Sequence, residues 1–264
     1  MVPNLDYRTR LEKTHEMSGH SKWHNIKLKK GKADAQRGAL FTKLSKEIIL
    51  AARGGSSDPE ANYRLKMAIE KARAFNMPHE NIKRAIARTS GQNNEREIEE
   101  IRYEGYGPHG LAAVVDAATD NRNRTAGELR FLFSRHDGAL GESGDVAWMF
   151  DPVGVVEIDP AGKSEEALME EALVDGVDDI EYDEDLAVIY TEPTHLADVR
   201  DGLRARGAKV SDAYLGMRAK TKVELHNGEL SSALAFLEAL EEHEDVQRVF
   251  SNLDFTHVPA EALA

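Results

Sequence analysis

A short segment near the start of the chain places cationic side chains around one aromatic ring. Residues 18–38, SGHSKWHNIKLKKGKADAQRG, have few apolar residues and no sustained period, which predicts a loosely held arm. Lysine and arginine neutralise phosphates, and an aromatic ring can stack on an unpaired base. The segment therefore favours polyanion binding, with Trp23 either stacking on a base or anchoring the arm. Its candidate contact residues are Lys22, Trp23, His24, Lys27, Lys29, Lys30, Lys32 and Arg37.

Charge is segregated along the chain. Residues 17–90 carry 16 Lys and Arg against 6 Asp and Glu, whereas residues 91–264 carry 15 against 38. The formal net charge of −13 therefore hides a basic beginning within an acidic protein. A dense cationic segment is the electrostatic footprint of nucleic-acid binding, although a solvated basic helix surface would give the same count. The acidic part should be repelled by phosphates, so it serves either solubility or a basic protein partner.

Several classes of function lack the residues they need. The chain has no cysteine, which excludes disulfides, thiolate nucleophiles and Cys-based zinc sites. It has no phosphate-binding P-loop, no nucleophile elbow and no HExxH motif, and no third ligand follows His20 and His24 at a recognisable spacing. No apolar run approaches the ~18 residues of a membrane span. We expect no enzyme activity, no cofactor, no metal, no small-molecule substrate and no membrane partner.

The remainder of the basic part has the spacing of three short helices. Apolar residues recur at helical intervals around residues 40–49, 65–72 and 82–86, which predicts a small bundle. Asp58 followed by Pro59 resembles an N-cap with a first-turn proline, and Pro78 opens the third helix. The cations between the apolar positions are expected on a basic outer side. The candidate contact residues on these helices are Lys43, Lys46, Arg64, Lys66 and Arg84. Lys71, Arg73, Lys83 and Arg88 are further cations of the second and third helices.

Beyond residue 91 the pattern changes to strands mixed with helices. Residues 153–217 have the order β-α-β-β-α-β of a ferredoxin-like unit, and mixed strands and helices lie on either side. This predicts one α+β domain interrupted by a second. Expected strands are residues 98–105, 111–117, 145–150, 153–158, 180–183, 186–190, 210–217, 221–225 and 246–252, and expected helices are residues 125–134, 164–174, 194–206 and 230–242.

The segment Thr119–Thr125, TDNRNRT, lies between a predicted strand and a predicted helix. Asp and Asn suit the turn, and either Asn123 or Thr125 could cap the helix. The alternative is that Arg122 and Arg124 extend an anion-binding surface from an otherwise acidic domain. Both interpretations stay open at this point.

In order along the chain, GHSKWHNI, RGALFTKLSKEI, NMPHENIKRAI, YEGYGPHG, TDNRNRT and WMF resemble the YebC/PmpR family, which includes the mitochondrial translational activator of cytochrome c oxidase. The resemblance covers residues 18–252. It implies an α-helical domain, an α+β domain and a ferredoxin-like domain inserted into the latter. The expected boundaries are residues 17–90, residues 91–152 with 218–264, and residues 153–217. Residues 1–16 lie outside the resemblance and are either a genuine extension or the product of a start codon upstream of Met17.

The resemblance also implies a non-enzymatic, cytoplasmic protein that binds nucleic acid. The favoured function is a DNA-binding regulator of transcription, which grips phosphates through the basic arm and helices. The bundle shows no clear helix-turn-helix signature, so base recognition does not follow from the residues. The alternative is a ribosome-associated translation factor that binds ribosomal RNA and assists the synthesis of proline-rich stretches, for which recognition of backbone and shape would suffice.

Overall fold

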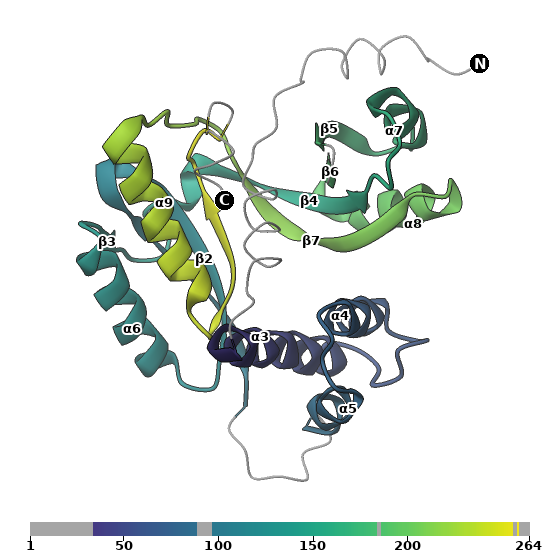
Figure 1. Cartoon of the computed structure of the whole chain (residues 1–264), viewed down its shortest axis with the longest axis horizontal. Coiled ribbons are helices and arrows are strands. Elements are labelled where there is room, and N and C mark those ends of the chain that lie inside the picture. Colours follow the sequence, from purple (N-terminus) through teal and green to yellow (C-terminus); the bar gives the residue numbers. More distant parts are fainter. Residues whose placement is uncertain (1–33, 89–96, 184–185, 256–257, 259–264) are drawn as a thin grey trace. The chain divides into compact units, whose positions relative to one another are not determined.

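The computed structural model describes residues 34–88, 97–183, 186–255 and 258 (Figure 1). Within these residues the chain forms two compact units. One contains residues 34–149 and 221–253, and the other contains residues 150–220 together with residues 254, 255 and 258. The described elements include seven α-helices and two antiparallel four-stranded sheets. This confirms the predicted mixture of an α-helical bundle with α+β structure.

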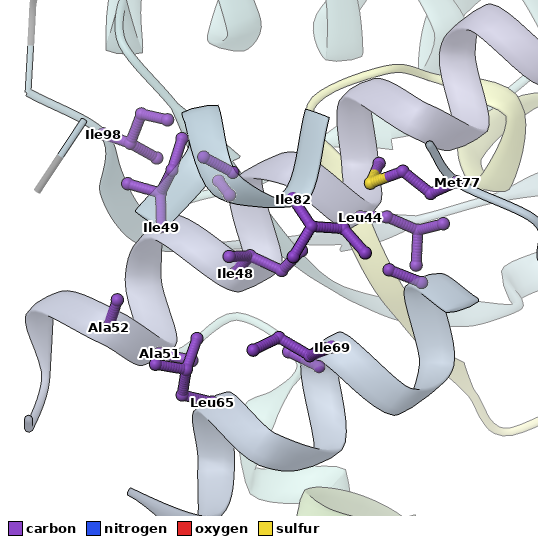
Figure 2. Packing of buried hydrophobic residues seen from close by; sticks show 14 residues of the cluster. Leu44, Ile48, Ile49, Ala51, Ala52, Leu65, Ile69, Met77, Ile82 and Ile98 are labelled. Atoms are coloured by element: carbon purple, nitrogen blue, oxygen red, sulfur yellow. The ribbon is translucent and has the colours of Figure 1, made fainter. Parts of the chain in front are cut away.

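Three helices form the bundle of the first unit. They are α3 (Asp34–Arg53), α4 (Tyr63–Ala74) and α5 (His79–Ala87). Their apolar residues fall at i, i+3 and i+4 intervals, so each helix presents one apolar stripe, and Figure 2 shows the stripes meeting in one core. Burial of each large side chain contributes about 1.5–3 kcal/mol. The core includes Leu44, Ile48, Ile49, Leu65, Ile69, Met77 and Ile82, together with Ile98 beside the adjoining sheet.

The start of α4 differs from the sequence prediction. Asn62 is the N-cap, and its side chain accepts a hydrogen bond from the Leu65 backbone N–H at 3.1 Å. The same side chain donates to the carbonyl of Ala51, at 2.7 Å, and so ties α4 to α3. The predicted cap Asp58 is wrong, because its carboxylate accepts from the Glu60 N–H, at 3.0 Å, in a local turn. One side chain, that of Asn62, therefore caps α4 and also bonds α3.

A second layer of the same unit is an antiparallel sheet with the strand order β3-β1-β2-β8. Helices α6 (Arg122–Arg135) and α9 (Asn227–Glu242) pack on it, and the rings of Phe133 and Phe236 meet edge to face, 5.0 Å apart. Helix α3 contacts β2 and β8. The strands are β1 (Glu99–Tyr106), β2 (Ala112–Thr119), β3 (Ala139–Leu140) and β8 (Val246–Ser251).

Two predicted strands are wrong. Residues 145–149 form turns and a one-turn 3-10 helix instead of a strand. The buried Glu104 carboxylate accepts the N–H groups of Val146 and Ala147 at 3.1 and 2.8 Å, so these backbone donors need no strand partner. Around residues 221–225 only a single bridge forms, between Val223 and Leu253.

The strands and helices of the second unit lie in residues 150–220 and have the predicted β-α-β-β-α-β order. Its strand order is β5-β6-β4-β7. The first and third strands of the unit, β4 and β6, therefore lie at the centre of the sheet, as in a ferredoxin-like fold. Buried Glu181 and Glu157 accept hydrogen bonds from Tyr190 and Tyr214 at 3.1 and 2.9 Å. The elements are β4 (Phe150–Asp159), α7 (Glu165–Glu171), β5 (Val177–Asp183), β6 (Leu186–Thr191), α8 (Leu196–Ala205) and β7 (Lys209–Ala219).

The bundle core generates a stability prediction. Leu65 is fully buried among α3, α4 and α5, so Leu65→Ala should lower the free energy of unfolding by about 2–5 kcal/mol through lost contacts and a residual cavity. Leu215→Ala is the matched control, because Leu215 is 60% exposed and its truncation should change stability by less than about 0.5 kcal/mol. Denaturant unfolding measures both. Equal losses in the two variants would contradict the assigned core.

Candidate nucleic-acid interface

The arm residues predicted to bind phosphates lie largely outside the described residues. Lys22, Trp23, His24, Lys27, Lys29, Lys30 and Lys32 precede residue 34. Arg37 lies on α3, at a position whose side chain is not described. Residues 17–90 have ten more basic than acidic side chains, and the five lysines before residue 34 account for half of this excess. Their binding role stays a prediction.

Lys43 and Lys46 point into the protein. Lys46 is only 9% exposed and pairs with the Asp245 carboxylate, and its ammonium lies 3.2 Å from the Glu244 carbonyl. Lys43 donates to the Glu241 carbonyl in the last turn of α9, where the helix dipole favours a cation. Burial lowers the pKa of Lys43 to about 8, although Glu241 acts to raise it. The prediction that both lysines lie on a solvent-facing side of their helix is wrong, because α3 packs against the acidic end of α9.

Asp245 is the centre of this contact. Its side chain is fully buried at the start of β8 and accepts hydrogen bonds from three groups. These are the Lys46 ammonium, the Arg124 guanidinium at 2.8 Å and the Thr125 hydroxyl at 2.6 Å. Burial acts to raise the pKa of Asp245, but the hydrogen bonds from Lys46, Thr125 and Arg124 outweigh it and lower the pKa to about 2. One carboxylate therefore joins α3, α6 and β8.

The TDNRNRT segment has a structural role in this network. Asn121 is the N-cap of α6 and accepts from the Arg124 N–H at 3.2 Å, so neither of the predicted caps, Asn123 and Thr125, is used. Thr125 is buried, and its hydroxyl forms a hydrogen bond with the Thr119 hydroxyl at 2.8 Å. Arg124 pairs with Asp245 and also with Asp120, at 3.2 Å. Arg122 alone of the two arginines is largely exposed, with a carboxylate of Glu99 4.0 Å away.

Two of the remaining predicted contact residues are paired at the surface. Arg64 pairs with Glu100, and Lys66 lies 3.1 Å from Glu60. Exposed pairs of this kind contribute about 0–1 kcal/mol, so a phosphate could compete for either cation. Lys71, which is half-buried, pairs with Glu47 at 3.2 Å.

An outer face of α5 retains its positive charge. We define it as Lys83, Arg84 and Arg88, all exposed and opposite buried Ile82 and Ala85. Arg84 bonds the neutral Asn81 side chain at 2.9 Å, and Lys83 lies 3.6 Å from exposed Glu80. Arg73, at the end of α4, is exposed as well. Of these residues only Arg84 was a predicted contact; the amphipathic pattern of α5 is the signal that could have included its neighbours.

One group of side chains has the composition of a metal site. Ligand atoms of Glu128, His243 and Asp245 lie within 4.8 Å of one another. The Asp245 carboxylate already faces Lys46 and Arg124, and His243 Nδ1 accepts the Asp245 N–H at 3.1 Å while Nε2 lies 3.0 Å from Glu128. A metal would have to displace two cations from Asp245. This group is therefore better described as a hydrogen-bonded network.

Comparison with known families matches nearly all of these elements. Residues 21–92 match the model described as the TACO1/YebC protein N-terminal domain, and residues 98–253 match the TACO1/YebC second and third domain. The chain belongs to the TACO1/YebC family. The resemblance inferred from the sequence motifs is thereby confirmed.

Curated relatives and a solved structure extend over most of the chain. A relative from Herpetosiphon aurantiacus is 47% identical over 249 residues, which cover 94% of this chain and 99% of the relative. One from Moorella thermoacetica is 49% identical and covers 90% and 96%, respectively; both carry the name "Probable transcriptional regulatory protein". The crystal structure of a conserved hypothetical protein from Aquifex aeolicus superposes with a TM-score of 0.77 at 42% identity, covering 83% of this chain and 91% of that one.

The names of the two curated relatives describe regulatory proteins. Among the helices of the described residues, none has an apolar stretch of the length that a bilayer requires.

The Asp245 network generates a prediction about stability and pH. Asp245→Asn should lower the free energy of unfolding by about 3–5 kcal/mol, because Lys46 and Arg124 would lose a buried counter-charge. The folded-state pKa of about 2 lies below the ordinary 3.8, so Asp245 stabilises the fold fully above about pH 4 and loses this contribution as the pH falls through 2. Urea unfolding curves of the wild type and of Asp245→Asn measure this. The difference in their free energies of unfolding should shrink as the pH falls from about 4 to about 2.

Glu100→Gln is the matched control for this prediction. Glu100 is also paired with a cation, Arg64, but both side chains are more than half exposed. Its replacement should cost less than about 1 kcal/mol. A loss for Asp245→Asn as small as that of Glu100→Gln, or a difference independent of pH, would contradict the central role of Asp245.

Proposed function

We propose that this protein is a cytoplasmic regulator of transcription that binds DNA through the cations of its N-terminal part. The proposal has two supports: the charges that the fold leaves exposed, and the regulatory names of its relatives. No catalytic step is assigned to any residue.

The single observation that carries the proposal is the outer face of α5. The fold directs Lys43, Lys46 and Lys71 to its own carboxylates and carbonyls, yet it leaves Lys83, Arg84 and Arg88 exposed with Glu80 as the only acid on that helix. Arg73 adds a further exposed cation from α4. Exposed cations that outnumber the acids around them raise the local potential and attract phosphates.

The remainder of the protein fits this arrangement through its opposite charge. Residues 91–264 carry 38 acidic against 15 basic side chains. A phosphate backbone should be repelled from most of this surface, so duplex binding is expected mainly at the N-terminal part, where the arm supplies five further lysines. Contacts to phosphates fix position and affinity, whereas recognition of a base sequence needs additional contacts to base edges.

Salt dependence tests the electrostatic basis of the proposal. If about six phosphates are neutralised, the logarithm of the affinity should fall with the logarithm of the salt concentration at a slope of about −4 to −5, because bound counterions are released. Fluorescence anisotropy with labelled duplex DNA at several salt concentrations measures this slope. A flat response, or no binding at low salt, would overturn the proposal.

Charge reversal tests where the DNA binds. The double variant Lys83→Glu/Arg84→Glu should weaken duplex binding about tenfold or more, because two charge-assisted contacts become repulsive. Reversal of Lys27, Lys29 and Lys30 to Glu in the arm should abolish binding while the protein stays folded. The control Lys209→Glu/Lys222→Glu makes the same change in charge on exposed residues elsewhere. Losses equal to those of the control would show that the assigned face is incorrect.

A further inference from the structure

Helix α6 carries an exposed aromatic side chain on the side opposite its core. Phe131 is 62% exposed, whereas Leu129 and Phe133 on the same helix are fully buried. Figure 1 shows this helix as an outer element of its unit, beside β3 and α9. We define the outer face of α6 by six of its exposed residues, Asn123, Gly127, Arg130, Phe131, Ser134 and Arg135; Arg122 and Glu128 are exposed as well. None of them contributes to the core of the unit.

Gly127 lies one turn before Phe131, in the interior of the helix. Glycine at such a position costs stability relative to alanine. A Cβ atom at Gly127 would meet no other atom within 4 Å, so packing within the described residues gives no reason for this glycine. Phe131 lies four residues after Gly127, on the same side of the helix. The absence of a side chain at Gly127 leaves this side of the helix open one turn before Phe131.

Two arginines flank Phe131, one residue before it and four residues after it. Among the described residues, neither Arg130 nor Arg135 has a hydrogen-bond or ion-pair partner for its guanidinium. Arg122, at the start of the helix, has only the Glu99 carboxylate 4.0 Å away. The one acid of α6, Glu128, lies 3.0 Å from His243 and 3.9 Å from Arg124. Arg130 and Arg135 thus place two positive charges close to the exposed ring, whereas Arg122 lies on the other side of the helix.

We propose that the outer face of α6 is a second nucleic-acid contact, specific for single strands. Phe131 stacks on an unpaired base, and Arg130 and Arg135 bind the phosphates on either side. A base within a duplex is already stacked on its neighbours and cannot lie on the ring. An apolar protein partner would have to bury Arg130 and Arg135 without counter-charges, which disfavours it. This inference rests on the proposed nucleic-acid binding. It adds a binding surface on α6 that is separate from the arm and from the outer face of α5.

The test uses the full chain and two labelled probes, a 20-nucleotide single strand and a duplex of the same length. Phe131→Ala should weaken single-strand binding about fivefold to 100-fold and leave duplex binding unchanged, because only the stacked base is lost. Phe131→Trp should retain the affinity and Phe131→Leu should not, since leucine keeps apolar bulk but has no π-face. The fluorescence of a 2-aminopurine base in the single strand changes when the base stacks. Binding of the wild type should produce this change, and binding of Phe131→Leu should not.

A double variant separates the effect of phosphate contacts on α6 from the effect of the total charge of the protein. Arg130→Ala/Arg135→Ala should weaken single-strand binding about tenfold or more and lower the salt slope by about 1–2, since two phosphate contacts are lost. Lys209→Ala/Lys222→Ala removes two exposed charges elsewhere and should have little effect. Leu215→Ala is the control for loss of an exposed apolar side chain. Thermal unfolding of each variant establishes that it is folded.

The outcomes distinguish this inference from the proposed function. Duplex binding by the wild type, with single-strand affinity unaffected by every α6 variant, would overturn the role of α6 and leave DNA binding intact. Absence of binding to both probes would overturn both. If the α6 variants change only self-association, measured by light scattering, the face is an interface between copies of this chain and the inference is incorrect.

Discussion

The buried carboxylate of Asp245 is the interaction on which the first unit depends. It lies at the start of β8 and binds a lysine from α3, together with an arginine and a threonine from α6. Burying a carboxylate is unfavourable unless charges and hydrogen bonds compensate for it, and here three donors do so. The helical bundle and the sheet of this unit are therefore joined by a specific ionic contact as well as by apolar packing.

This contact also decides which cations of the basic part can meet a ligand. Lys46 neutralises Asp245, and Lys43 is held at the end of α9, so neither is available to a phosphate without opening the unit. The outer face of α5 and the outer face of α6 keep their cations at the surface. The count of positive charges in the sequence thus overstates the number of cations that α3 can offer to a ligand.

Much of the fold could be predicted from local patterns. The apolar spacing of the three bundle helices and the β-α-β-β-α-β order of residues 150–220 are properties of short segments, and both match the structure. What could not be predicted depends on partners distant in sequence. Lys46 looks like a surface residue until α3 meets residue 245, and residues 145–149 look like a strand until Glu104 binds their N–H groups. Asn62 replaces Asp58 as a cap because it also bonds Ala51.

The central claim is that the fold divides its lysines into those engaged internally and those open to nucleic acid. Acetylation footprinting by mass spectrometry, with and without duplex DNA, tests this division at each lysine. We expect Lys46 to react slowly in both states, and Lys83 and the lysines of the arm to react quickly in the free protein and to be protected by DNA. Rapid modification of Lys46 in the free protein, with protection by DNA, would contradict the account.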